Sequence, residues 1–244
     1  MRKIAIILLI VTKISFGQDF KTGLLIPDLK IVDESEICCI YIPKDGFNVY
    51  SSPNGEIIGK LSRLNNSLEV EQELYKLYFI EKNTKKQELL NLSDFQEIGY
   101  EIWALKYIDS KNNFIKVELK NHNFWINKDE ILRKGFKVVN WQTFLLENAD
   151  NLLGYYANDK GLNLREEPND NSKIIATVKG DLFEIKPTPE NVNTWTKVKI
   201  RKYKKHPCLS DLNETELIEY ELEGWLKLVD ENGNPNVWYY ARGC

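Results

Sequence analysis

The chain has 244 residues, of which 43% are hydrophobic and 11% aromatic, and its formal net charge at pH 7 is −3. This composition supplies enough apolar side chains for one large or two ordinary folded domains, and it excludes a largely disordered chain. The acidic excess argues against a surface that follows nucleic-acid phosphates, because such a surface needs a clear excess of Lys and Arg.

Residues 1–17 have the pattern of a secretory signal peptide. A basic start is followed by the apolar run 4–12 and by small residues before Gln18, in the order typical of such a peptide. The run is too short to span a bilayer comfortably. We therefore expect cleavage near Gly17 and Gln18 and a periplasmic or secreted mature chain without a membrane span. An ordinary buried N-terminal strand or helix is the alternative.

The mature chain stays mildly acidic, because residues 1–17 contain three basic residues and no acidic one. Its most basic stretch, 201–205, includes an aromatic residue, and a nucleic-acid site would start there. A strand that runs into a loop commonly has its charges on a solvated face. We therefore expect no nucleic-acid partner.

Alternation of apolar and polar residues is common, and it predicts strands over 114–119 and 195–200. Helical periodicity is rare, and it predicts only a short amphipathic helix over 141–153 and a turn of helix over 88–95. The expected fold class is therefore mostly β. Residues that tolerate tight backbone angles predict hairpin ends at 45–46, 53–55, 109–113, 158–161 and 231–235.

An internal repeat is the most informative feature of the sequence. Four segments recur in the same order on both sides of the predicted helix, so we expect each copy to be a separate domain. The pairs are Gly46–Asn54 with Gly161–Asn169, Glu56–Gly59 with Lys173–Ala176, Phe114–Val117 with Trp195–Val198, and Phe124–Asn127 with Gly224–Lys227.

The physical basis of the repeated unit can be read in the second copy. Leu162 and Leu164 alternate with polar residues, so one face of this strand enters a core. Asn163 can hydrogen-bond the backbone of the neighbouring turn, which Pro168 then fixes. Five short strands of this kind close a small barrel.

Four short segments of the second copy carry a resemblance to a known family. They are Leu162–Pro168, Val178–Gly180, Trp195–Val198 and Gly224–Leu226, with Asn163, Arg165, Pro168, Trp195, Gly224 and Trp225 as the structural motif. Over residues 157 to about 230 the chain resembles a bacterial SH3 domain, apart from an inserted hairpin at 201–223. The first copy, 38–133, departs further, with Tyr50 where the family has arginine, Phe124 where it has glycine, and a long insertion at 62–101.

The resemblance implies two small SH3-like β-barrels in tandem, joined by a short α-helical linker. The chain then divides into a signal peptide (1–17), a first SH3-like domain with an N-terminal extension and a long insertion (18–140), a helical linker (141–156) and a second SH3-like domain (157–244).

Bacterial SH3 domains often attach to cell-wall peptides or accompany wall hydrolases as the targeting part. The resemblance therefore implies an exported, non-catalytic binding protein that recognises cell-wall peptide (peptidoglycan) or an envelope protein. Two alternatives stay open: a structural or interaction protein of the periplasm without a small ligand, and a cryptic enzyme such as a wall-hydrolase accessory. An enzyme of the cysteine type needs a distant activating histidine, and only His122 and His206 are present. We expect no catalytic residue, metal site or cofactor.

Ligand contact on small barrels usually involves aromatic rings backed by a few polar groups. Trp195 and Trp225 occupy strand positions typical of a core, so we expect them to pack rather than to touch a ligand. The binding candidates are Tyr155, Tyr156, Tyr203, Trp238, Tyr239 and Tyr240.

The four cysteines matter because export implies a compartment in which disulfides persist. Adjacent Cys38 and Cys39 point to opposite faces of a strand, whereas Cys208 in a loop and Cys244 at the end of the sequence could meet. We predict this last pair, worth roughly 3 to 4 kcal/mol in the chain-entropy model. Four unpaired thiols are the alternative.

Overall fold

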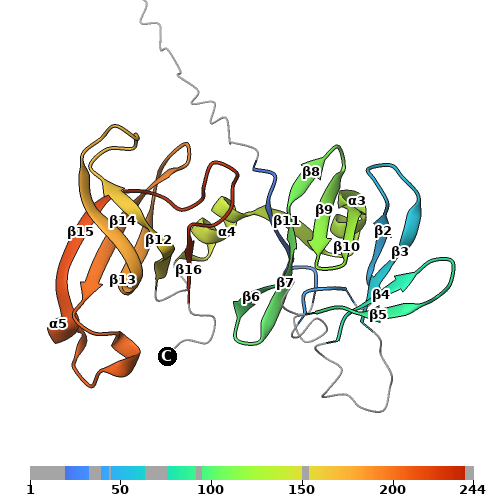
Figure 1. Cartoon of the computed structure of the whole chain (residues 1–244), viewed down its shortest axis with the longest axis horizontal. Helices are drawn as coiled ribbons and strands as arrows, with labels where there is room; N and C mark the ends of the chain where they lie inside the picture. The colour runs from blue at the N-terminus through green and yellow to red at the C-terminus, as the bar shows by residue number, and fades with distance from the viewer. Residues whose placement is uncertain are drawn as a thin grey trace, which may run out of the picture.

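The computed structural model describes residues 20–32, 40–43, 45–63, 76–91, 95–149 and 154–239. They form a mostly β structure, 55% strand and 10% helical, which confirms the predicted class. Figure 1 shows two lobes side by side, with a short helix between them. The predictions for the signal peptide and for Cys38, Cys39, Tyr240 and Cys244 concern residues outside the described ranges.

The first lobe contains two sheets, of which the smaller has the strand order β11-β1-β7-β6. Strand β1 is central because it pairs with both β11 and β7. Its adjacent residues Leu24 and Leu25 are both fully buried, so both faces of this N-terminal strand are covered. The strands are β1 (Gly23–Pro27), β6 (Gln96–Gly99), β7 (Ile102–Tyr107) and β11 (Phe136–Asn140).

The larger sheet of the first lobe has the order β5-β4-β3-β2-β10-β9-β8 and is open at both ends. The helical turn predicted over 88–95 is wrong, because residues 87–89 form a strand in a hairpin with β4. The backbone turns back at Lys85, which has a φ of 59°. The elements are β2 (Phe47–Tyr50), β3 (Ile57–Ser62), β4 (Tyr78–Glu81), β5 (Gln87–Leu89), β8 (Asp109–Lys111), β9 (Phe114–Leu119), β10 (His122–Asn127) and helix α3 (Lys128–Arg133).

The second lobe is a single five-stranded sheet whose pairings close on themselves. Strand β12 pairs with β13 and with β15, so the order β12-β13-β14-β15 returns to β12, and β16 is added to β12. The predicted hairpin end at 158–161 is wrong, because these residues lie within β12 as an irregularity in its pairing with β13. The elements are β12 (Tyr155–Arg165), β13 (Ile174–Val192), β14 (Trp195–Tyr203), 3-10 helix η3 (Pro207–Leu209), α5 (Glu214–Leu217), β15 (Ile218–Lys227) and β16 (Val237–Trp238).

The repeated segments pair in the same register in both lobes. A register shift falls at the same place in each copy, between Val49 and Tyr50 and between Leu164 and Arg165. The turn before the third segment also matches, because Asn112 and Asn193 have positive φ values of 52° and 55°. The corresponding cross-strand pairs are Val49–Gly59 and Leu164–Ala176, Tyr50–Trp125 and Arg165–Trp225, Lys116–Trp125 and Lys197–Trp225, and Val117–Phe124 and Val198–Gly224.

The helix between the lobes, α4 (Trp141–Glu147), is a packing element. Asn140 caps its first turn by accepting a hydrogen bond from the backbone N–H of Thr143 at 2.8 Å. Trp141 and Phe144 are buried and both contact the ring of Trp238, with centroid distances of 5.6 and 6.1 Å. The helix therefore fixes the last strand of the second lobe against the end of the first.

Hydrogen bonds also join the lobes directly. The Thr22 hydroxyl donates to the carbonyl oxygen of Gly233 at 2.9 Å, and the Tyr239 hydroxyl donates to that of Ile98. The Gln142 side-chain amide donates to the carbonyl oxygen of Asn193 at 3.0 Å. Most of the buried apolar residues of both lobes form one contiguous cluster.

Candidate binding surface

Two of the predicted binding tyrosines lie inside the junction between the lobes. Tyr155 and Tyr239 are only 1% and 5% exposed, and their rings meet edge to face. The Tyr155 hydroxyl donates to the carbonyl oxygen of Leu145 at 2.7 Å. Burial raises the pKa of both phenols. Their assignment as ligand contacts is therefore corrected, because these side chains are covered and their hydroxyl groups are bonded to backbone.

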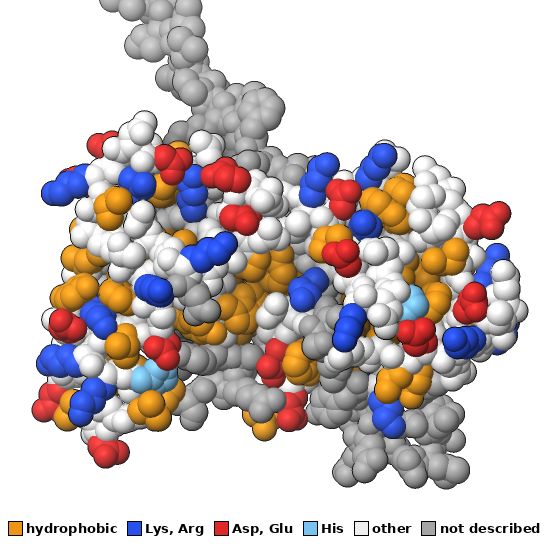
Figure 2. Space-filling model, viewed as in Figure 1, with side chains coloured by type: hydrophobic (Ala, Val, Ile, Leu, Met, Phe, Trp, Pro, Cys, Tyr) orange, Lys and Arg blue, Asp and Glu red, His pale blue; other side chains and the backbone are white. Residues whose placement is uncertain are grey.

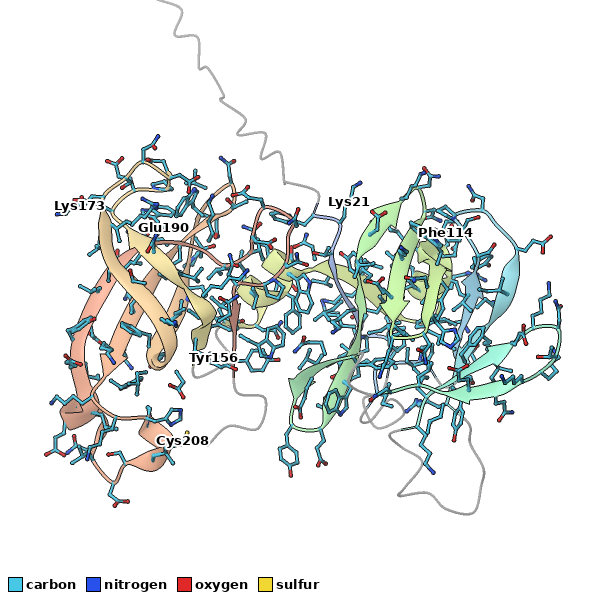
Figure 3. All side chains as sticks on the ribbon, in the orientation of Figure 1. Lys21, Phe114, Tyr156, Lys173, Glu190 and Cys208 are labelled. Carbon is cyan, nitrogen blue, oxygen red and sulfur yellow. The ribbon has the colours of Figure 1, made fainter. Side chains whose placement is uncertain are left out.

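Trp238 and Tyr156 border the same junction but remain partly exposed. Tyr156 pairs across the sheet with Trp238, and Figure 3 shows it on the side of the second lobe that faces the first. Burial, and then the charge of Asp181, raise the pKa of the Tyr156 phenol. Figure 2 shows hydrophobic side chains at the surface where the lobes meet. Because the Trp238 ring stacks on Phe144 and Tyr239, its role is mainly to hold the lobes together.

The outer face of the second lobe carries an aromatic and charged surface. Along β14, Val198 and Ile200 are buried inside the ring of strands, while the alternate residues point outward. Trp225 stands on this outer face, directly between Arg165 on one neighbouring strand and Lys197 on the other. Its ring is partly exposed, so the expectation of a core position for Trp225 is wrong.

Trp195 lies on the same outer face but is only 7% exposed. The ammonium group of Lys227, its cross-strand neighbour, sits over the Trp195 ring at 4.9 Å from the centroid. Asp170 and Glu231 hold this ammonium group at 3.0 and 2.7 Å. The structural role predicted for Trp195 therefore agrees with its burial, although the cover is a salt-bridged lysine and not a hydrophobic core.

The rest of the structural motif supports the strands behind this face. Gly224 has no room for a side chain, because a Cβ there would lie 2.7 Å from the Arg165 carbonyl oxygen. The Arg165 guanidinium donates to the carbonyl oxygen of Ser172 at 2.6 Å and spans the turn that contains Pro168. Asn163 accepts a hydrogen bond from the Thr177 hydroxyl at 3.3 Å instead of bonding the turn backbone.

The first lobe presents a related face at the equivalent register. Trp125 is partly exposed between Tyr50 and Lys116 on the two neighbouring strands. The Tyr50 ring packs edge to face on buried Phe114, with a centroid distance of 5.2 Å. Each repeat thus exposes a tryptophan beside a lysine, at positions that correspond in register.

A groove of about 380 Å³ continues the outer face of the second lobe across β13, β14 and β15. Arg201 bonds to Glu221 at 2.7 Å and lies 4.0 Å from Glu184, which also accepts a hydrogen bond from the Tyr203 hydroxyl. Burial and the Glu184 carboxylate raise the pKa of Tyr203. Of the predicted binding tyrosines that the structure describes, Tyr203 lies next to this groove, but this residue is only 8% exposed and its hydroxyl is bonded to Glu184. The groove is lined by Glu184, Lys186, Lys199, Ile200, Arg201, Glu221, Leu222 and Glu223.

The cysteine and histidine side chains, which could act as nucleophiles or metal ligands, do not lie together at one place in the described structure. Cys208 is disulfide-bonded, so it offers no free thiol, and the predicted pairing with Cys244 concerns a residue outside the described ranges. His206 accepts a hydrogen bond from the Cys208 backbone at 3.1 Å. His122 is on β10 in the other lobe, 3.1 Å from Glu88. Within the described ranges, no three His, Cys, Asp or Glu residues are grouped to hold a metal ion.

No helix in the described part of the chain combines the length and apolarity needed to cross a membrane. Comparison of the chain with protein-family models, curated proteins and solved structures found no match. The case for a function therefore depends on the surface described above.

Proposed function

We propose that this protein is an exported, non-catalytic binding protein built from two SH3-like modules, and that its ligand is a cell-wall peptide or an envelope protein. The expectation of two closed barrels is narrowed to the second module, because the sheet that contains the first repeat is open at both ends. The carrying observation is the partly exposed tryptophan at the equivalent register of each repeat, Trp125 and Trp225, each beside a lysine. An exposed indole on a rigid strand is costly to leave in water, and it is a common anchor for ligands.

The pairing of the strands supports the SH3-like part of the proposal. The two copies share their registers, the position of the register shift and the turn before the third segment. In the second copy the pairings close on themselves, as expected for a small barrel.

The chemistry of the outer face supports a peptide as the ligand. A peptide presents apolar side chains, which an indole can cover, together with amide and charged groups that pair with lysine, arginine and carboxylates. Trp225 lies between two cations, and three carboxylates line the groove further along the same strands. Such a mixed surface suits a ligand that carries both signs of charge.

Retention on purified peptidoglycan tests the proposal. The mature chain, residues 18–244, is mixed with insoluble peptidoglycan at low salt and sedimented, and the bound fraction is measured. We expect retention of the wild type and a loss of roughly tenfold for Trp225→Ala, because truncation of an aromatic anchor costs more than about 1 kcal/mol. Tyr220→Ala is the matched control, since Tyr220 is an exposed aromatic on the same strand but outside this face.

A structural or interaction protein without a small ligand is the second candidate. It is favoured by the burial of Tyr155 and Tyr239 between the lobes, because these aromatic residues serve packing and not an exposed site. Flow-through of the wild-type protein at low salt would support this candidate and contradict the proposed wall binding.

A further inference from the structure

Two lysines of the groove face each other on neighbouring strands. Lys186 on β13 and Lys199 on β14 are directly paired, and both are exposed and line the groove. Residues opposite each other in an antiparallel pair have Cβ atoms roughly 5 Å apart, and like charges at such positions are destabilising. Lys199 also faces Glu223 on its other side, on β15, whereas Lys186 faces Lys199. A ligand that neutralises the repulsion between the two lysines would bind favourably.

The carboxylates of the groove are already paired with other cations. Arg201 is bonded to Glu221 and lies near Glu184, and Lys197 is bonded to Glu223 at 2.8 Å. The hydrogen bond from Lys197 is the main reason that the pKa of Glu223 is lowered, and Lys199 contributes least. Within the described ranges, neither the Lys186 nor the Lys199 ammonium group has a side-chain hydrogen bond or a salt bridge, although both residues belong to the strand ladder.

We propose that Lys186 and Lys199 form a subsite for the carboxylate of a peptide ligand. Two lysines can bind an oxyanion, which could belong to a phosphate or to a peptide carboxylate. The neighbouring carboxylates of the groove favour the peptide. Glu184, Glu221 and Glu223 line the same groove and would repel a dense polyanion such as a polyphosphate. A peptide carboxylate brings one negative charge, and its own N–H groups can donate to these glutamates.

The inference rests on the proposed function, because the groove and Trp225 share one outer face. The inference adds that the groove binds the carboxylate of the peptide. Two probes that differ only in their C-terminal group distinguish recognition of the carboxylate from a general affinity for peptides. The acid is N-acetyl-alanyl-alanine with a free C-terminal carboxylate, and the matched probe is the same dipeptide with a C-terminal amide.

The experiment is an NMR titration of the ¹⁵N-labelled mature chain with each probe and with inorganic phosphate. We expect the acid to shift amide signals of β13 and β14 and to bind more tightly than the amide. Lys186→Gln and Lys199→Gln should each weaken acid binding by about two- to fivefold, the range of an exposed ion pair, and leave amide binding unchanged. Lys179→Gln is the control, an exposed lysine of β13 outside the groove.

The Lys186→Gln variant also gives a readout that a purely structural role would not produce. Lys186→Gln removes a repulsion between like charges, so its thermal midpoint should stay equal or rise while acid binding falls. Lys199→Gln also removes the attraction to Glu223 on β15, so its midpoint is not used as a readout. Equal affinity for acid and amide, or a lowered midpoint in Lys186→Gln, overturns the subsite. Tighter binding of phosphate than of the acid assigns the lysines to phosphate and overturns the peptide carboxylate.

The two proposals can fail separately. If Trp225→Ala reduces retention on peptidoglycan but the lysine variants keep the selectivity for the acid, the binding protein stands and the subsite is wrong. If the wild type is not retained and the lysine variants lose acid binding, the subsite stands as a small-anion site and the wall ligand is wrong.

Discussion

The two repeats share the register of their strands but differ in whether the sheet closes. In the second lobe, β13 runs unbroken over 19 residues and pairs with β12 at one end and β14 at the other. In the first lobe the insertion at 62–101 separates the strands that would correspond to β13. Strand β7, which follows the insertion, pairs with β1 in the smaller sheet. The same motif thus produces a closed ring in one place and an open sheet in the other.

This difference shows which contacts stabilise each lobe. A closed ring has no unpaired strand edges within it, whereas the open sheet ends in the short strands β5 and β8. The first lobe compensates with a second sheet centred on β1 and with α3, whose buried Glu130 accepts hydrogen bonds from the backbone and side chain of Asn48 at 3.0 and 3.1 Å. We therefore expect the first lobe to depend on distant segments and the second to depend on its own strands.

The largest expected effect is at the junction of the two lobes. Trp141→Ala should destabilise the protein by about 3 to 5 kcal/mol, as truncation of a buried aromatic does, because Trp141 is 4% exposed and contacts Trp238. Urea unfolding followed by circular dichroism measures the change. Leu132→Ala, at a 61% exposed position of α3, should change stability by less than about 0.5 kcal/mol. Loss of only the first lobe, with the second unfolding as in the wild type, would show that the lobes are independent.

An intermediate effect is expected at Gly224, where two strands of the second lobe approach closely. Gly224→Val should cost about 1 to 3 kcal/mol through overpacking, because its Cβ would lie 2.7 Å from the Arg165 carbonyl oxygen. The first repeat has Phe124 at this position, so the constraint belongs to the second lobe alone. Gly180→Asn is the control, since a Cβ there meets nothing within 4 Å and Asn tolerates its positive φ. Equal thermal midpoints for wild type and Gly224→Val would contradict the close approach of the two strands.

The smallest effect concerns an ion pair that only the second repeat has. Lys197 holds the pKa of Glu223 below its ordinary value, whereas the equivalent residue of the first repeat is the uncharged Asn123. Because this pKa is lowered in the folded state, the interaction is present at neutral pH and is lost as the pH falls through the lowered pKa. Carboxyl ¹³C titration should show the Glu223 midpoint rising in Lys197→Gln, and a midpoint that does not move would refute the pairing.

Local pattern was sufficient for the strands and turns of the repeats. The alternation over 114–119 and 195–200 and the turn residues at 109–113 and 231–235 correspond to strands and turns in the structure. The outward position of Trp225 could also have been recognised, because in β15 it alternates with the same parity as Glu221, Glu223 and Lys227. The sequence predicts a solvated face over 201–205, of which only Arg201 lines the groove. The other charged residues of the groove could not be grouped with it, because a single strand does not show which residues of its neighbours lie beside it.

By itself, the sequence determined the β class, the repeated strands and the register that its matched segments later adopt, because these depend on the period of the side chains and on turn residues close in the chain. Only the tertiary structure decided that one repeat closes and the other stays open, and that Tyr155 and Tyr239 are buried between the lobes. The physical reason is that burial and closure depend on contacts between distant segments, such as Tyr239 with Ile98 and Trp141 with Trp238.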